Sequence, residues 1–185
     1  EKDFIAKIHK RLAQITIGSS ALRNQGAKGL VAITRNYLEH EIVLNDFFSK
    51  LPNEKNFKSF LDNHTEDLLR KYPKSGKSWG AARKSLNLFF RELVYNKFIA
   101  DHFGLSKNFS SYNKSIANLE IPLDKDVAEG IFNNTKSEIP KWKSIKGLGQ
   151  AVSDQYQNAA KSIAAKKGIP KIHLDLLYWR PDTHQ

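Results

Sequence analysis

The sequence predicts an all-α protein, and three observations lead to that prediction. Apolar residues recur at spacings of three and four in several long segments, which is the period of an amphipathic helix. Alternation of Val, Ile and Thr with polar residues never persists, so the signals for strands are poor. Capping and helix-breaking residues separate the periodic segments. The sequence shows neither an internal repeat nor a low-complexity tract.

The first part of the chain is expected to form several amphipathic helices. One helix should run from Asp3 to Ile15 and stop at residues 17–20, where Gly and Ser interrupt the pattern. Residues 27–48 should form one kinked helix or two. Another helix should cover residues 57–69 and end at the Pro73–Gly76 turn.

Residues 78–103 are expected to form the longest and most buried helix. Ser78 can cap its start and Gly104 can close its end. Its broad apolar stripe indicates a central position in the core. The stripe consists of Ala82, Leu86, Phe89, Phe90, Leu93, Val94, Phe98 and Ile99.

The last third of the chain predicts shorter elements. Residues 105–118 are rich in Ser, Asn and Lys, which indicates a loop with a weak helix. Short helices should follow at residues 124–132 and 153–167, the latter ended by Gly168. Residues 170–179 should form a final helix opened by a proline.

Length and composition point to one helical domain over residues 1–185, which could divide into lobes 1–72 and 73–185. A hydrophobic content of 40% suits a packed interior. No apolar run approaches the length of a membrane-spanning helix, and no secretory signal pattern opens the sequence. The absence of cysteine excludes disulfides, thiolate catalysis and Cys-ligated metals. The six histidines lack the spacing of metal ligands, so we expect no metal site. The absence of cysteine fits a reducing cytoplasm. We also expect a monomer without a cofactor.

The charge balance predicts a nucleic-acid partner. The net charge is +11, from 30 Lys and Arg against 19 Asp and Glu, and the isoelectric point is about 9.7. Phosphate contacts supply most non-specific affinity for DNA, and they need such an excess of cations. High solubility or an anionic partner protein are the alternatives. A membrane surface is not expected, because no segment is basic on one face and broadly apolar on the other.

The segment Glu120–Ala128 contains the first candidate catalytic residue. An apolar-Pro-apolar run ends at Asp124, and a helical segment begins directly behind it. A carboxylate in a cationic protein suits attack on a nucleic acid, because the oxocarbenium-like cation of a reacting sugar needs an anion beside it. The alternative is an ordinary N-cap, a position that Asp favours in any helix.

The segment Lys74–Lys84 is a candidate phosphate-binding turn. Glycines before a helix let backbone N–H groups approach an anion, which the helix dipole also favours. Trp79 could stack on a base or wedge into a duplex. A Walker A loop is rejected, because position 71 is Lys and no strand precedes the turn. The alternative is a capped turn with a buried Trp. The candidate DNA-binding residues here are Lys74, Gly76, Lys77, Trp79, Gly80 and Arg83.

A second candidate hairpin is Ile145–Gly149. The pattern apolar-x-Gly-apolar-Gly before a helix is typical of helix–hairpin–helix modules, whose backbone amides hold a phosphate without reading sequence. Lys146, Gly147 and Gly149 are its candidate DNA contacts, and a plain loop is the alternative.

The remaining candidates lie near the two ends of the chain. Asp175 and Trp179 fall at i and i+4, so they share one helical face, and Asp175 is a second candidate acid. The alternative is a docking helix with Asp175 paired to a Lys or Arg. Polar residues that could bind a base edge or phosphate precede Gly26. The full set of candidate pocket residues is Arg23, Asn24, Gln25, Asn87, Tyr156, Gln157, His173 and Trp179.

Together these motifs resemble the helix–hairpin–helix superfamily of DNA glycosylases. The pattern reads Gly76 to Gly80, then Arg83-Lys84 on a long helix, then Ile121-Pro122-Leu123-Asp124. The archaeal 8-oxoguanine branch looks closest. The resemblance implies a helical bundle with a cleft between two lobes, Asp124 as catalytic acid and Lys84 as a possible Schiff-base lysine. A rival register uses the Ile145–Gly149 hairpin and Asp175.

The resemblance implies a function in base excision. The enzyme would flip a base out of double-stranded DNA, excise it and leave an abasic site. The hairpin before Lys84 departs from the family's Leu-Pro-Gly-Val-Gly, which favours an enzyme without strand-nicking activity. The motif Trp-Gly-Ala-Ala-Arg-Lys-Ser-Leu-Asn is also similar to small bacterial proteins of defence-like character, which suggests an anti-phage enzyme acting on glucosylated hydroxymethylcytosine. The alternatives are a non-catalytic basic DNA- or RNA-binding module, or an adaptor protein of a defence system.

Overall fold

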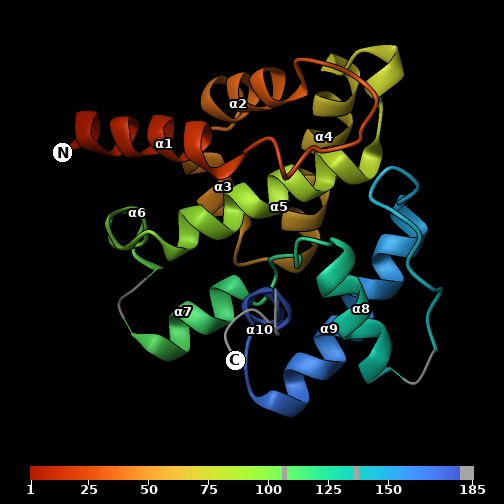
Figure 1. Cartoon of the computed structure of the whole chain (residues 1–185). Helices are drawn as coiled ribbons and strands as arrows, with labels where there is room; N and C mark the ends of the chain where they lie inside the picture. Colours follow the sequence, from red (N-terminus) through yellow and green to blue (C-terminus); the bar gives the residue numbers. More distant parts are fainter. Residues whose placement is uncertain (106–107, 136–137, 180–185) are drawn as a thin grey trace, which may run out of the picture.

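The computed structural model describes residues 1–105, 108–135 and 138–179, and over these residues all regular structure is helical (Figure 1). The all-α prediction is therefore confirmed. The elements in chain order are α1 (Lys2–Thr16), α2 (Leu30–His40), α3 (Leu44–Lys50), α4 (Glu54–Lys71), η1 (Lys74–Gly76), α5 (Trp79–Tyr95), α6 (Lys97–His102), α7 (Phe109–Ile116), α8 (Lys125–Asn134), α9 (Gln150–Lys167), η3 (Lys171–His173) and α10 (Leu174–Tyr178).

Side-chain caps fix where many of these helices begin. In each case an Asn, Ser or Asp oxygen accepts the backbone N–H three residues on, which satisfies an otherwise unpaired donor. Gly168 ends α9 in the left-handed conformation, with φ of 68°, as the sequence predicts. The capping residues are Asn53, Ser78, Asn96, Asn108 and Asp124.

The interior consists of two hydrophobic clusters that divide near residue 120. The first is built by α1 to α7 around α5, the helix expected to be central. The second is built by α8, α9 and α10 with the segment before α8. Within the described residues, α5 packs mainly with the helices that precede it (Figure 1), and Ile172 of η3 joins the same cluster.

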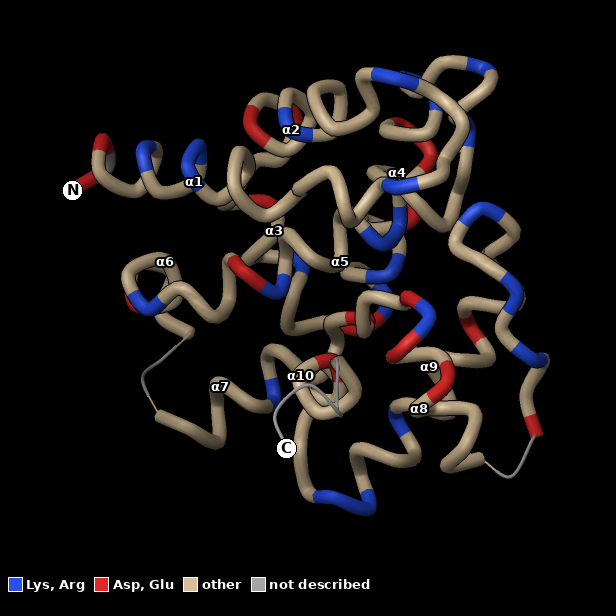
Figure 2. The backbone as a smooth tube through the Cα atoms, viewed as in Figure 1, with Lys and Arg blue, Asp and Glu red and all other residues tan. Residues whose placement is uncertain are grey.

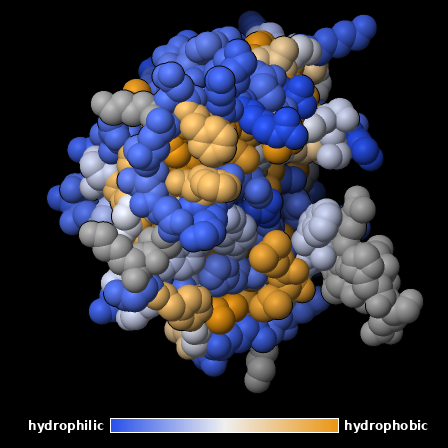
Figure 3. Space-filling model, turned by 90° about the vertical axis from the view of Figure 1, so that its left-hand side faces the viewer, coloured by the Kyte–Doolittle hydropathy of each residue, from blue (hydrophilic) through white to orange (hydrophobic). Residues whose placement is uncertain are grey.

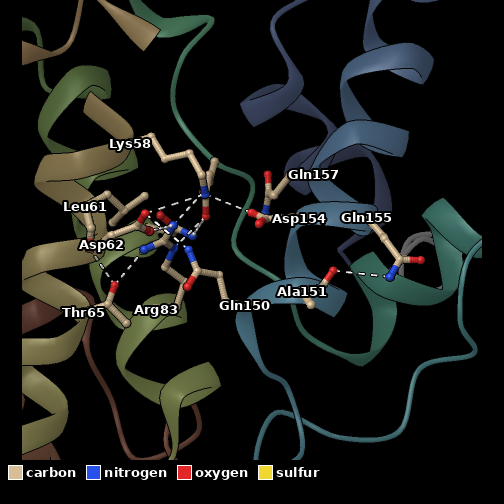
Figure 4. Close-up of polar contacts among 12 residues, drawn as sticks. Lys58, Leu61, Asp62, Thr65, Arg83, Gln150, Ala151, Asp154, Gln155 and Gln157 are labelled. Atoms are coloured by element: carbon tan, nitrogen blue, oxygen red, sulfur yellow. Dashed lines mark hydrogen bonds and ion pairs between the residues drawn. The ribbon is translucent and has the colours of Figure 1, made fainter. Parts of the chain in front are cut away.

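A buried polar network joins the two clusters. Arg83 on α5 is 2% exposed and donates from Nε and Nη2 to the two carboxylate oxygens of Glu120, both at 2.8 Å. It also donates to Asp62 at 2.7 Å and to Thr65 at 2.9 Å on α4. Figure 4 shows that Gln150 of α9 reaches the same Asp62. The network thus ties α4, α5 and α9 together at the junction.

The expected helix over residues 78–103 is two helices, α5 and α6. The chain is extended at Asn96, with φ of −77° and ψ of 111°, because the Asn96 side chain caps α6 through Ile99 N–H. The break turns Phe98 out of the apolar stripe, and it is 62% exposed.

Other boundaries also differ from those predicted. Residues 27–48 form two separate helices, and the first begins only after Gly29, whose φ is 82°. Residues 109–116, expected to be mainly loop, form α7 behind the Asn108 cap. The final helix is a 3₁₀ turn followed by the short α10. None of the described helices would span a bilayer, since each is too short or too polar.

A candidate active site at the junction of the two clusters

A cavity of about 610 Å³ lies where the two clusters meet, and we call it the cleft. One wall comes from the α1–α2 connection and from α5. The other comes from the start of α8, the turn before α9, and α10. The three candidate catalytic residues, Lys84, Asp124 and Asp175, all line it. The remaining lining residues are Thr16, Gly18, Ser20, Ala21, Arg23, Leu88, Arg91, Lys125, Asp126, Ile145, Leu176 and Trp179.

Lys84 and Asp124 form an ion pair inside the cleft. Nζ of Lys84 lies 3.4 Å from Oδ2 of Asp124, and the two side chains are 10% and 23% exposed. Oδ1 of the same carboxylate accepts the Val127 N–H at 3.1 Å. The carboxylate therefore caps α8 with one oxygen and meets Lys84 with the other. The two interpretations of Asp124, as helix cap and as cleft-facing acid, are compatible.

Asp175 lies in the same cleft, held by Arg91 of α5. The residue is 4% exposed, and its Oδ2 accepts from Arg91 Nη1. Burial raises the pKa of Asp175 to about 6; the negative charge of Asp124 adds to the rise, whereas Arg91 and Lys84 oppose it. The carboxyl group is thus neutral in part of the molecules near neutral pH.

Arg91 is a cleft residue that the sequence reasoning missed. It divides its guanidinium between Asp175 and Glu92, which accepts from Nε at 3.0 Å and from Nη2 at 2.6 Å. Residues 84, 88 and 91 are spaced i, i+4, i+7, so they share one face of α5. That spacing was the signal in the sequence that could have identified Arg91.

Two further contacts hold α10 against the cleft. The hydroxyl of Tyr95 and Nδ1 of His173 are 2.7 Å apart, and their rings stack. Burial lowers the pKa of His173, which favours the neutral form of the ring. The ring of Tyr178 packs so closely on Gly130 of α8 that a Cβ there would collide with it. His173 therefore holds α10 in place and does not line the cleft.

The two hairpins expected as rival sites lie side by side. A Cβ on Gly80 would collide with the Ile145 carbonyl oxygen, so glycine allows the turn before α9 to pack on the start of α5. The Ser78 hydroxyl donates to the same oxygen at 3.4 Å. The α1–α2 connection lies close to the second hairpin. A Cβ added to its Gly26 would be only 3.3 Å from Lys146 Nζ.

These three connections form a strongly basic surface, which we call the basic face. It consists of Arg23, Lys28, Lys74, Lys77, Lys143 and Lys146, all exposed. Within residues 1–105, 108–135 and 138–179, none of these six forms an ion pair. In contrast, Lys50 and Lys97 elsewhere on the molecule pair with acids at i−4 and i+4. Figure 2 shows the cations along these connections.

The basic face continues into the cleft. A neighbouring cavity of about 470 Å³ shares Arg23, Lys125 and Ile145 with the cleft, and Lys143 and Lys146 line it as well. Asn24 and Gln25 line this neighbour and not the cleft. The two cavities therefore adjoin one another along Arg23, Lys125 and Ile145.

Several predicted DNA contacts are corrected by the structure. Arg83 is buried with Glu120 and Asp62, so it cannot reach a phosphate. Gly76 is buried against Ala27 and Leu30. Trp79 packs on the second cluster, with the Arg83 guanidinium 5.1 Å from its ring, and does not project as a wedge.

Three of the predicted pocket residues are core residues instead. Asn87 is buried and donates to Glu120 at 3.3 Å. Tyr156 donates to the Pro140 carbonyl oxygen at 2.7 Å. Gln157 makes two hydrogen bonds with the backbone of Ile121, each 2.9 Å. Gln157 thereby fixes the segment that presents Asp124.

The side of the molecule formed by α1 and α6 has a different character. Phe4 and Phe98 meet edge to face with ring centroids 5.6 Å apart, and both are more than half exposed. Figure 3 views this side and shows apolar patches on a mostly hydrophilic surface. In the described part of the chain, no group of three or more His, Cys, Asp or Glu side chains is arranged to hold a metal ion.

Comparison with known proteins finds no match. No family model fits the sequence, and no curated protein or solved structure is significantly similar to the chain. The functional argument therefore rests on the residues and the geometry of this chain.

Proposed function

We propose that the protein is a DNA glycosylase of the helix–hairpin–helix type, which excises a flipped-out base and leaves an abasic site. One observation carries the proposal. Lys84, Asp124 and Asp175 come from three separate elements, yet they meet in one cleft at the edge of the basic face. Lys84 and Asp124, the two residues to which the glycosylase resemblance assigns chemistry, both line the cleft.

The cleft offers what cleavage of a glycosidic bond requires. Asp124 presents a carboxylate that can stabilise the cation developing on the deoxyribose and orient water at C1′. The Val127 N–H at the start of α8 and the Lys84 ammonium group hold that carboxylate in position. Leu88, Leu176 and Trp179 supply apolar surface against which a base can pack.

The basic face accounts for DNA binding in this proposal. Its exposed cations lie on the α1–α2 connection and on the segments before α5 and α9. Phosphates of the duplex would contact this face, and the target nucleotide would rotate into the cleft. The extrusion costs a few kcal/mol of unstacking, offset by contacts in the cleft.

The position of Lys84 bears on the chemistry after base release. The irregular hairpin in the sequence favoured an enzyme that does not nick the DNA strand. In such an enzyme Lys84 would only contact a phosphate. Lys84, however, is 10% exposed and pairs with Asp124 inside the cleft, so its amine is within reach of a sugar that lies against Asp124 rather than on the outer surface. This placement favours a Schiff base with the abasic sugar.

The size of the cleft supports a bulky target base. A cavity of about 610 Å³ falls in the range that holds drug-sized ligands. Asp126 adds a further hydrogen-bond acceptor at its edge for hydroxyl groups. A glucosylated hydroxymethylcytosine of phage DNA therefore belongs on the list of substrates to test, beside 8-oxoguanine.

The proposal is tested by incubating the protein with duplexes that carry normal, oxidised, methylated and glucosylated bases. Alkali then cleaves any abasic site, and the fragments are separated. We expect cleavage of at least one modified duplex and none of the unmodified control. Failure on the whole panel, with tight binding of the same duplexes, would favour the alternative below.

The alternative is a non-catalytic nucleic-acid-binding module. It is favoured by the fact that both acids have structural partners, Asp124 as a cap and Asp175 with Arg91. In that case neutralising Asp124 to Asn changes neither binding nor any reaction.

A further inference from the structure

We propose that Asp175 is a second catalytic group of the cleft, which protonates the departing base while Asp124 stabilises the sugar cation. The inference rests on the proposed base excision and assigns different tasks to the two acids. In glycosidic bond cleavage such a division is useful, because the leaving group needs a proton and the cation needs an anion.

The two acids come from different elements and contact α5 at two separate positions. Lys84 and Arg91 lie seven residues apart on the same face of α5, roughly 10 Å along its axis. Asp124 pairs with Lys84, and Asp175 pairs with Arg91. Leu88 lies between the two pairs and also lines the cleft. A nucleoside against Leu88 would therefore have one acid at either end.

The surroundings of the two acids differ in the way that the division requires. Asp124 accepts from Lys84 and from a backbone N–H at the start of α8. Asp175 is buried on α10, and burial raises its pKa to about 6. Two acids that lie in one site in different surroundings can take the roles of acid and anion.

The charged and titratable groups around Asp175 come from several elements. Arg91 and Lys84 of α5 lower its pKa, and Asp124 at the start of α8 raises it. Glu92 shares the Arg91 guanidinium, which weakens the hold of Arg91 on Asp175. The pair formed by Tyr95 and His173 lies beside them. From the α1–α2 connection, Arg23 lines the opposite wall.

The chemical step balances with water alone. The bond between C1′ and the base nitrogen breaks, and its electron pair stays with the base. The carboxyl group of Asp175 gives its proton to the base, which leaves as a neutral molecule, and becomes a carboxylate. Water adds to C1′ beside Asp124 and releases one proton, and Asp175 regains a proton from solvent. Where Lys84 bonds to C1′ instead, its ammonium group first gives a proton to the Asp124 carboxylate, 3.4 Å away, and the same proton transfer from Asp175 accompanies departure of the base.

The test is the pH profile of base release from the duplex that the panel identifies, carrying 8-oxoguanine or glucosylated hydroxymethylcytosine. For the natural protein, kcat/KM should fall as pH rises through about 6, since the proton donor is lost. Asp175→Asn should lower kcat/KM below that pH by roughly 10²-fold. The same variant should lose the alkaline fall, because Asn cannot titrate. Its Kd for the duplex should stay within about twofold of the natural value, since Asp175 is not on the basic face.

A second variant separates catalysis from a structural role. Arg91→Gln removes the counter-charge, so the alkaline fall should move to higher pH. A residue that only holds α10 in place would lower activity equally at every pH. An unchanged pH profile in Asp175→Asn, with full activity, would overturn this inference and leave the proposed excision standing. Absence of base release by the natural protein from every duplex would overturn the proposed function as well.

Discussion

The ammonium group of Lys84 and the carboxylate of Asp124 lie 3.4 Å apart, although 40 residues separate them in the chain. Three helical elements intervene, α6, α7 and the greater part of α5. The buried segment before α8, fixed by Gln157, returns the chain to the middle of α5. The 40-residue separation of Lys84 and Asp124 in the chain therefore does not prevent their contact.

The first prediction concerns Asp124. Asp124→Asn should abolish base excision while DNA affinity and thermal stability stay near those of the natural protein, because Asn is an equally good N-cap. Glu129→Gln, which removes an exposed carboxylate on α8 that pairs with Lys125, is the matched control and should retain activity. Excision is measured by alkali cleavage, affinity by fluorescence anisotropy. Full activity in Asp124→Asn would transfer the main role to Asp175.

The second prediction concerns Lys84. Borohydride added during the reaction should trap a covalent complex of the protein with DNA, because it reduces a Schiff base. Lys84→Gln should yield no trapped complex, whereas Lys50→Gln, which removes an ion-paired cation away from the basic face, should yield the normal amount. Gel electrophoresis in denaturant reports the complex. If the natural protein releases the base but borohydride traps no covalent complex, the enzyme is monofunctional. The hairpin before Lys84, which departs from the family pattern, favours that outcome.

The third prediction links Asp175 to stability. Its folded-state pKa lies above the unfolded value, so its neutral form stabilises the fold at low pH and this contribution is lost as pH rises through about 6. Between about pH 4 and about pH 7, the free energy of unfolding of the natural protein should fall by about 2–3 kcal/mol relative to that of Asp175→Asn. Urea unfolding of both proteins across that range measures the difference. A constant difference would mean that Asp175 does not titrate there.

The fourth prediction separates Arg83 from the DNA contacts. Arg83→Met should cost about 3–5 kcal/mol of unfolding free energy, because it leaves Glu120 buried without its partner. Adding Glu120→Gln should restore part of the loss. Chemical denaturation of the single and double variants checks this. A stable Arg83→Met protein with weakened DNA binding would instead support a phosphate contact.

The fifth prediction concerns the basic face. Affinity for duplex DNA should fall steeply between about 50 and 200 mM salt, since phosphate contacts release counterions. Lys143→Gln and Lys146→Gln should each reduce the slope of log K against log salt by about 1. Lys50→Gln and Lys97→Gln, which remove ion-paired cations elsewhere, should leave the slope unchanged. Equal effects of all four variants would show that net charge alone governs binding.

The sequence was most informative where local chemistry decides the outcome. The helical class, the central α5, the Asp124 cap and the Gly168 terminus follow from periodicity and from single capping residues. The break at Asn96 was missed because the apolar spacing continues through it, whereas an Asn side chain can cap a new helix at any such point.

The site could be predicted only in part. Motifs identified Lys84, Asp124 and Asp175, but only the tertiary fold reveals that they share a cleft. Arg83 was assigned to phosphate because exposed and buried arginines look alike in a sequence; its partners Glu120 and Asp62 are distant along the chain. The two hairpins were treated as rivals because nothing in the sequence shows that Gly80 lets the second pack on the first.

The central claim is that Asp124 performs base excision in the cleft, and the most direct measurement is mass-spectrometric detection of the free base. The natural protein and Asp124→Asn are each mixed in excess with the modified duplex, and the small-molecule fraction is analysed. The account predicts one free base per target site with the natural protein and none with the variant. Equal release by both proteins, or none by either while both bind the duplex, would contradict it.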